Sequence, residues 1–78
     1  MVNLNTSEST DPRILFGKRL ANVRKELGWS QEKLAIESGL ARSYLSGVER
    51  GIRNIALLNI CKLAGTLGVS AKDLMDIC

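Results

Sequence analysis

The sequence predicts a single all-α domain built from five short helices. Apolar residues recur every three or four positions in successive segments, and no segment alternates apolar and polar residues as a half-buried strand would. Glycine, serine or proline stands where these segments begin and end, as is typical of helix termini. With 78 residues the chain has room for one small core, so a second copy of the chain is a reasonable partner from the outset.

The first helix is predicted to follow a disordered tail. Residues 1–10 are rich in Asn, Ser and Thr without apolar periodicity, and the ordered domain is expected to span residues 11–78. Asp11 is a good N-cap and Pro12 a good first helical residue. Gly28 should end this helix. Its buried face is predicted to contain Phe16, Leu20, Val23 and Leu27.

Two short helices are predicted next, separated by a tight turn. Ser30 can cap the first of them, and Trp29 is placed to pack on Leu34 as a hydrophobic staple. This helix ends at Gly39, where glycine readily adopts a left-handed backbone, and the next runs from about residue 41 to 50. The side chains expected to point inward from the first of the pair are Leu34, Ala35 and Ile36.

The last two helices complete the predicted core. A fourth helix is expected over residues 56–67, ended by Gly68, and a short fifth helix follows a capping box formed by Ser70 and Asp73. The apolar set of the fourth helix is Leu57, Ile60, Leu63, Ala64 and Leu67. The fifth carries Leu74, Met75 and Ile77, either for the protomer's own core or for a dimer interface with neighbouring residues of the fourth helix.

The third helix has an outer face that suits DNA. A rotation of 100° per residue puts Leu45 and Val48 on one side. The opposite side gathers Arg42, Ser43, Ser46, Gly47 and Arg50. A helix with short side chains between two arginines can enter the major groove, which is just wide enough for one. A short helix, a glycine turn and a second helix that crosses it form a helix-turn-helix, in which the second helix reads bases.

Residues 31–50 also resemble the phage Cro and repressor-type (XRE-like) helix-turn-helix family, and the likeness extends from Phe16 to the C-terminus. In this motif Gln31 stands first, Ala35 fifth, Gly39 ninth and Leu45 fifteenth, with apolar Leu34, Leu40 and Val48 at other buried positions. The segment SYLSGVERGIRNIALLNICKLAGTLGVS is most similar to the controller proteins of restriction–modification systems. The resemblance implies a five-helix domain of the lambda-repressor type that dimerises and regulates transcription from nearby promoters, including its own.

The resemblance also implies a division of labour among polar residues. Arg42 should read guanine, which a guanidinium can contact through two hydrogen bonds, and Ser43 and Ser46 should touch bases. The residues expected at the DNA backbone are Gln31, Tyr44, Arg50, Arg53 and Asn54. The alternative for Tyr44 is that its ring packs over the flank of the helix instead of contacting a phosphate. Ala56 stands where the family often has Ser, so the fourth helix lacks the usual N-cap hydroxyl.

Glu49 needs an explanation because a carboxylate beside a DNA-facing surface would repel phosphate. The resemblance implies that Arg24 of the first helix neutralises it in a structural ion pair.

The expected partners are a double-stranded DNA operator and a second copy of the chain, with RNA polymerase as a further candidate in activation. One recognition helix reads too few base pairs to select a site among about 10⁶ genomic positions, whereas a symmetric pair reads two half-sites. The alternatives are a phage-like or stand-alone repressor, an antitoxin, or a helical module that binds protein without DNA affinity. Salt-dependent DNA binding separates the last from the rest.

Other classes of function fit the composition poorly. The chain has no His, no nucleophile motif and no paired carboxylates, so the sequence argues against an enzyme. Cys61 and Cys78 lack zinc-ligand spacing and are interpreted as a core thiol and a terminal free thiol, so no metal or cofactor is expected. No stretch approaches a membrane span or a signal peptide, which predicts a cytoplasmic protein. The net charge of +3 is compatible with a nucleic acid but does not require one.

Overall fold

The architecture is all-α. A computed structural model describes residues 11–77, which form α1 (Pro12–Glu26), α2 (Gln31–Ser38), α3 (Arg42–Glu49), α4 (Leu57–Leu67) and α5 (Ala71–Leu74), without a strand in that range. The tail predicted for residues 1–10 lies outside the described residues, as does Cys78. None of the helices in the described range is long and apolar enough to cross a membrane.

Local signals in the sequence set the helix boundaries. The Asp11, Ser30 and Ser70 side chains each accept a hydrogen bond from the backbone N–H two or three residues later, at 2.9, 3.0 and 3.0 Å, and so cap α1, α2 and α5. Helices α3 and α4 follow Ala41 and Ala56, and neither start has a side-chain cap. Although Ala56 offers no capping hydroxyl, α4 begins at Leu57, within one residue of the start that the apolar periodicity predicts.

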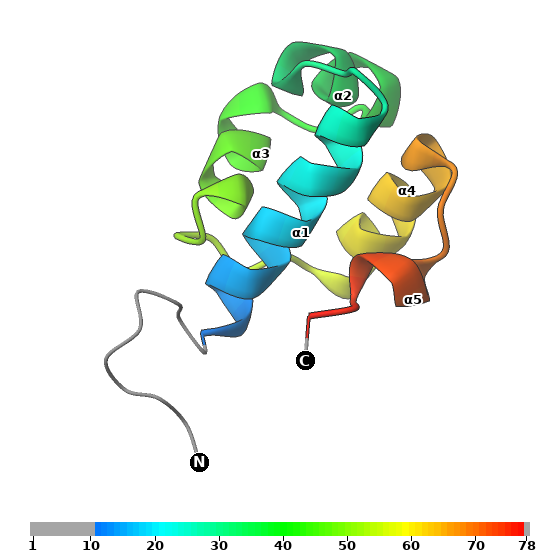
Figure 1. Cartoon of the computed structure of the whole chain (residues 1–78). Helices are drawn as coiled ribbons and strands as arrows, with labels where there is room; N and C mark the ends of the chain where they lie inside the picture. Colours follow the sequence, from blue (N-terminus) through cyan, green and yellow to red (C-terminus); the bar gives the residue numbers. More distant parts are fainter. Residues whose placement is uncertain (1–10, 78) are drawn as a thin grey trace.

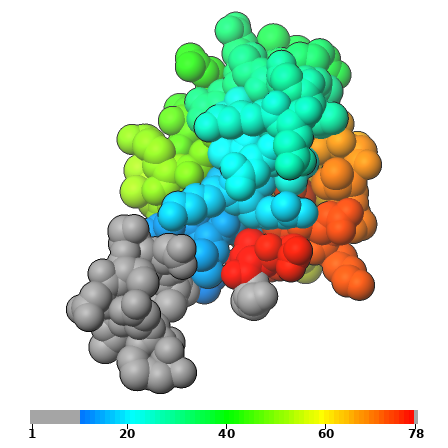
Figure 2. Space-filling view, in the orientation of Figure 1, coloured from blue at the N-terminus to red at the C-terminus, as the bar shows by residue number. Residues whose placement is uncertain are grey.

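The helices pack around one core, with α1 through the middle of the molecule (Figure 1). Helix α1 contacts α3 and α5, α2 contacts α3 and α4, and α4 contacts α5. The space-filling view shows the C-terminal residues against the first turns of α1 (Figure 2), where Arg19 Nε donates a hydrogen bond to the Asp73 carbonyl at 2.8 Å. The buried apolar residues are Phe16, Leu20, Val23, Leu34, Leu45, Val48, Ile60, Leu63, Ala64, Leu67 and Leu74.

Four side chains expected to be buried are exposed, each for a local reason. Leu27, Ile36 and Leu57 are exposed rather than buried. Leu27 lies at the C-terminal cap of α1 and Leu57 is the first residue of α4, where no further turn covers them. Ile36 lies on the outer side of α2, between the buried positions Leu34 and Ser38. Cys61, interpreted as a core thiol, is exposed because Ile60 occupies the adjacent buried position.

The turn between α2 and α3 sets the angle between those helices. Gly39 has φ 75°, a left-handed conformation that costs an L residue with a side chain but not glycine. Its N–H donates to the Ala35 carbonyl at 2.8 Å and closes α2. The chain then needs only Leu40 and Ala41 before α3 begins, so the two helices cross at close range.

Candidate nucleic-acid interface

Helix α3 presents a polar face to solvent because its apolar residues are fully used by the core. Leu45 and Val48 are 0% and 1% exposed. Arg42 and Ser43 on the first turn are exposed, and Ser46 on the next turn is half-buried. The outward side of α3 therefore carries the Arg42 guanidinium at its start and the short hydroxyl side chains of Ser43 and Ser46 after it. A surface of this kind can approach base edges closely without a bulky apolar side chain in between.

The start of α2 lies beside this face. A shallow hollow is lined by Gln31, the first residue of α2, together with Arg42, Ser43 and Ser46 of α3. Donors and acceptors from both helices therefore converge on one open site, and the N-terminal end of α2, with its free backbone N–H groups, borders the same place. The tight turn at Gly39 is what brings the two helices together here.

Arg24, Glu49 and Gln31 form a hydrogen-bonded network behind the hollow. Arg24 Nε and Nη2 donate to the two carboxylate oxygens of Glu49 at 2.7 and 2.9 Å, the pair that the sequence analysis expected. Both side chains are largely buried, and the hydrogen bond with Glu49 raises the pKa of Arg24. Arg24 Nη1 also donates to the Trp29 carbonyl at 2.6 Å, so one guanidinium ties α1, the α1–α2 turn and α3 together.

Gln31 belongs to the same network, which its position in the sequence did not reveal. Its Nε2 donates to Glu49 Oε1 at 2.8 Å. The bond fixes the amide beside the hollow and leaves the amide oxygen and the second N–H for a ligand. Glu49 is thus neutralised by Arg24 and hydrogen-bonded by Gln31, so its carboxylate does not face the hollow as an unpaired negative charge.

The other arginines predicted to contact DNA, Arg50 and Arg53, lie at or beyond the C-terminal end of α3. Arg50 is exposed at the C-terminal cap of α3, and its Nε donates to the Ser46 carbonyl at 3.3 Å. Arg53 and Asn54 are exposed in the loop that follows. The guanidinium carbon of Arg53 lies 5.7 Å from the centroid of the Tyr44 ring, and the Tyr44 hydroxyl accepts a hydrogen bond from Asn59 at 3.1 Å. Gly47, expected on the outer face, is buried.

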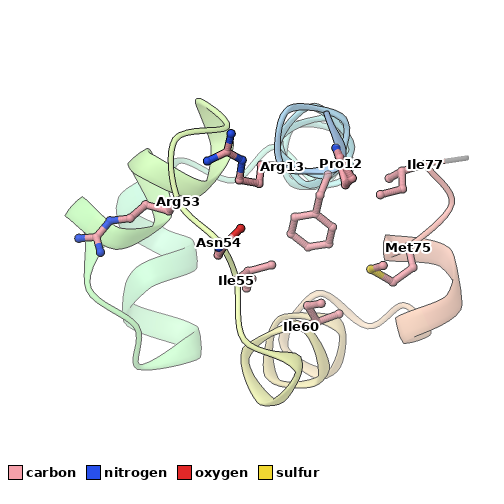
Figure 3. Close-up of a pocket in the computed structure, with 9 residues that line it drawn as sticks. Pro12, Arg13, Arg53, Asn54, Ile55, Ile60, Met75 and Ile77 are labelled. Atoms are coloured by element: carbon pink, nitrogen blue, oxygen red, sulfur yellow. The ribbon is translucent and has the colours of Figure 1, made fainter. Parts of the chain in front are cut away.

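The residues predicted for a dimer interface separate into two groups. Leu74 is 0% exposed and fills the protomer's own core, so its assignment to the interface was wrong. Met75 is exposed and Ile77 half-buried. Both line an apolar hollow of about 180 Å³ between the start of α1, the loop after α3 and α5 (Figure 3). Leu57 and Leu58 at the start of α4 add two more exposed leucines that the sequence analysis did not single out for the surface.

Within residues 11–77 there is no cluster of three or more His, Cys, Asp or Glu side chains that could hold a metal ion. The polar groups that converge on the hollow beside α3 are amide, hydroxyl and guanidinium groups, which suit an anionic, hydrogen-bonding ligand.

Comparison with known proteins points the same way. Residues 20–74 match the helix-turn-helix family model HTH_3. The chain is 49% identical to the control protein C.BamHI of Bacillus amyloliquefaciens over 65 residues, which cover 82% of this chain and 80% of that protein. The crystal structure of the restriction-modification controller protein C.AhdI from Aeromonas hydrophila matches with a TM-score of 0.78 and 52% identity, covering 80% of this chain and 94% of that chain. The structure of SinR, a master regulator for biofilm formation, in complex with DNA matches with a TM-score of 0.75 and 39% identity, covering 78% of this chain and 98% of that chain.

Proposed function

The chain belongs to the helix-turn-helix family, and from this premise we propose that it is a sequence-specific DNA-binding transcriptional regulator, the controller protein of a restriction–modification system. The observation that carries the proposal is the narrow polar face of α3, exposed beside the start of α2 and joined to it by the hollow lined by Gln31, Arg42, Ser43 and Ser46. The likeness to a relative named as a control protein, and to a solved structure named as a restriction-modification controller protein, supports the finer assignment.

In the proposed complex α3 enters the major groove and α2 crosses the backbone. Arg42 donates two hydrogen bonds to the O6 and N7 of a guanine, while Ser43 and Ser46 contact neighbouring base edges. The residues proposed at phosphates are Gln31, Tyr44, Arg50, Arg53 and Asn54. The amide of Gln31, already fixed by Glu49, and the N-terminal N–H groups of α2 suit the same phosphate.

We propose that the protein binds its operator as a homodimer. One α3 reads only a few base pairs, so a palindromic pair of half-sites requires two copies. The described surface offers an apolar patch for that contact: Leu57 and Leu58 of α4, 73% and 81% exposed, with Met75 and Ile77 beside the apolar hollow. Exposed apolar residues are candidates for such an interface. RNA polymerase is the further partner that activation would require.

A titration with two duplexes tests the proposal. The purified protein is added to a labelled duplex from upstream of its own reading frame and to a scrambled duplex of the same composition, at about 50 and about 200 mM salt. We expect tighter binding to the upstream duplex and a loss of roughly a thousandfold in affinity between the two salt concentrations, as for proteins that contact six or more phosphates. Binding that is weak, independent of salt and equal for both duplexes would contradict the proposal and favour a protein-binding module.

The controller assignment has its own test. Reading frames for a DNA methyltransferase and an endonuclease beside this gene are expected for a restriction–modification system. Transcription in vitro from their promoters should then change with the concentration of this protein. A neighbourhood without either gene, together with operator binding, would point to a stand-alone repressor instead.

A further inference from the structure

Arg53 is held in a slot made by residues of α3. The loop that carries it follows α3. Arg53 is one of the residues that line the apolar hollow beside this loop, but the end of its side chain points away from the other lining residues (Figure 3). The slot has two walls, Gly47 and Tyr44, which lie three residues apart and therefore on the same side of α3.

Gly47 provides the first wall by having no side chain. A Cβ atom built on Gly47 would lie 2.7 Å from Cγ of Arg53, 3.7 Å from Cδ and 3.5 Å from Nε. These are the three nearest atoms, so the space that a side chain would fill at residue 47 is taken by the stem of Arg53. This explains why Gly47 is buried although it lies on the outward half of α3. It also accounts for a glycine inside a helix, where it costs about 1 kcal/mol relative to alanine.

Tyr44 provides the second wall. Its ring packs against the core cluster, and its hydroxyl accepts a hydrogen bond from Asn59 Nδ2 at 3.1 Å, so the ring is anchored at both ends. The guanidinium carbon of Arg53 lies 5.7 Å from the ring centroid, within the range of a cation–π interaction. Within residues 11–77 the ion pairs are made by other side chains, which leaves the guanidinium donors of Arg53 for a ligand.

We propose that Gly47 and Tyr44 are positioning residues that hold the Arg53 guanidinium alongside α3 for contact with a DNA phosphate. This inference rests on the proposed function. An arginine in solution must lose the rotamer freedom of its long side chain when it binds. Arg53 is ordered by the slot beforehand, so its contact with phosphate costs less than that of an unsupported arginine.

The test compares Gly47→Ala with Gly65→Ala as the matched control. Both place alanine at a helical glycine, but a Cβ at Gly65 has nothing within 4 Å. The first readout needs no DNA: the proton shifts of the Arg53 side chain, which the Tyr44 ring current displaces in the folded protein. We expect Gly47→Ala to return these shifts toward free-arginine values and Gly65→Ala to leave them displaced. Displaced shifts that survive in Gly47→Ala would overturn the slot, whatever happens with DNA.

The second readout is affinity for the upstream duplex. Gly47→Ala and Arg53→Ala should each weaken binding by about tenfold, and the double variant should be no weaker than Arg53→Ala alone. A further loss in the double variant would mean that alanine at residue 47 clashes with DNA itself, and would overturn the positioning role. Should Gly47→Ala not fold, Tyr44→Leu removes the other wall, whereas Tyr44→Phe keeps the ring and removes only the hydroxyl. The Leu variant should bind more weakly than the Phe variant when Arg53 is present, and the two should bind equally once Arg53 is alanine. A wild-type protein that binds no duplex refutes the proposed function and the positioning role together, while its Arg53 shifts still show whether the slot exists.

Discussion

At the scale of single residues, Glu49 illustrates how an unfavourable charge becomes structural. Its carboxylate would repel phosphate beside α3, but it accepts hydrogen bonds from Arg24 and Gln31 and is withdrawn from solvent. A buried charge pair contributes little net stability, yet removal of one partner is costly because it strands the other charge. Glu49 therefore acts mainly by fixing Arg24 and Gln31 in place.

Replacement of Glu49 by alanine should accordingly destabilise the fold. We expect the free energy of unfolding to fall by about 3 kcal/mol, because the Arg24 guanidinium is left buried without its carboxylate. Chemical denaturation followed by circular dichroism measures this. The control is Glu37→Ala, which breaks an exposed pair with Lys33 at 3.5 Å and should cost less than about 0.5 kcal/mol. Equal losses in the two variants would contradict the structural role of Glu49.

Residues of the candidate interface could be predicted from the sequence, but some of the contacts between them could not. The helical rotation of 100° per residue was enough to place Arg42, Ser43 and Ser46 on the outer face of α3. The link between Gln31 and Glu49 joins residues 18 apart, and the cover of Gly47 by Arg53 depends on how a loop folds back. Neither has a local pattern. The glycine inside a helix was the one available signal of a close approach.

At the scale of elements, α1 and α3 approach each other closely where Gly17 of α1 faces the backbone of α3. A Cβ atom on Gly17 of α1 would lie 2.4 Å from the carbonyl oxygen of Val48 and 2.6 Å from that of Glu49. Both are backbone atoms of α3, which cannot move aside as a flexible side chain can. Gly17 therefore allows α1 to pack directly against the end of α3 at Glu49, the residue whose side chain also forms the ion pair with Arg24 of α1.

Gly17→Ala should therefore be among the most damaging small substitutions in the chain. The added methyl group forces α1 and α3 apart, and overpacking of this kind costs about 1–3 kcal/mol. The same change at Gly65, where a Cβ meets open space, should stabilise α4 by about 0.5–1 kcal/mol. Thermal melts of both variants check the contrast. A Gly17→Ala protein as stable as the wild type would show that α1 and α3 are less tightly packed than described.

The order and type of the elements could be predicted because caps and periodicity are local. Asp11, Ser30 and Ser70 mark helix starts in the sequence, and the corresponding hydrogen bonds are present. Burial at helix ends could not be predicted, as Leu27 and Leu57 illustrate, because it depends on which neighbouring helix covers the last turn. Leu74 was ambiguous for the same reason: only the packing of α5 against α1 and α4 places it in the core.

At the scale of the whole molecule, the hollow beside α3 and the exposed leucines of α4 belong to different elements. Gln31, Arg42, Ser43 and Ser46 line the hollow, and Leu57 and Leu58 form a second region at the start of α4. Met75 and Ile77, by contrast, line the same apolar hollow as Arg53 and Asn54. A symmetric dimer formed through the second region would leave both copies of α3 free for two half-sites.

Leu58→Asp should separate the proposed dimer. Leu58 is 81% exposed in the protomer, so an aspartate there leaves the fold intact but places a charge in the apolar contact. Sedimentation at tens of micromolar should give a dimer for the wild type and a monomer for the variant. Ile36→Asp, at an apolar residue of α2 that is 71% exposed, should remain dimeric. A monomeric wild type that binds its operator fully would exclude the dimer model.

We propose that α3 reads bases through Arg42 while Arg50 contacts the DNA backbone, and paired affinity measurements on two variants distinguish these roles. Affinities of Arg42→Ala and Arg50→Ala are measured on operator and scrambled duplexes over a range of salt. Arg42→Ala should cost about 1–3 kcal/mol on the operator, relax discrimination at one base position per half-site, and affect the scrambled duplex less. Arg50→Ala should weaken both duplexes by similar factors and reduce the salt slope by roughly one unit for each phosphate that Arg50 neutralises. An Arg42→Ala protein that binds both duplexes more weakly by the same factor and keeps its base preferences would contradict the account, because Arg42 would then only neutralise another phosphate.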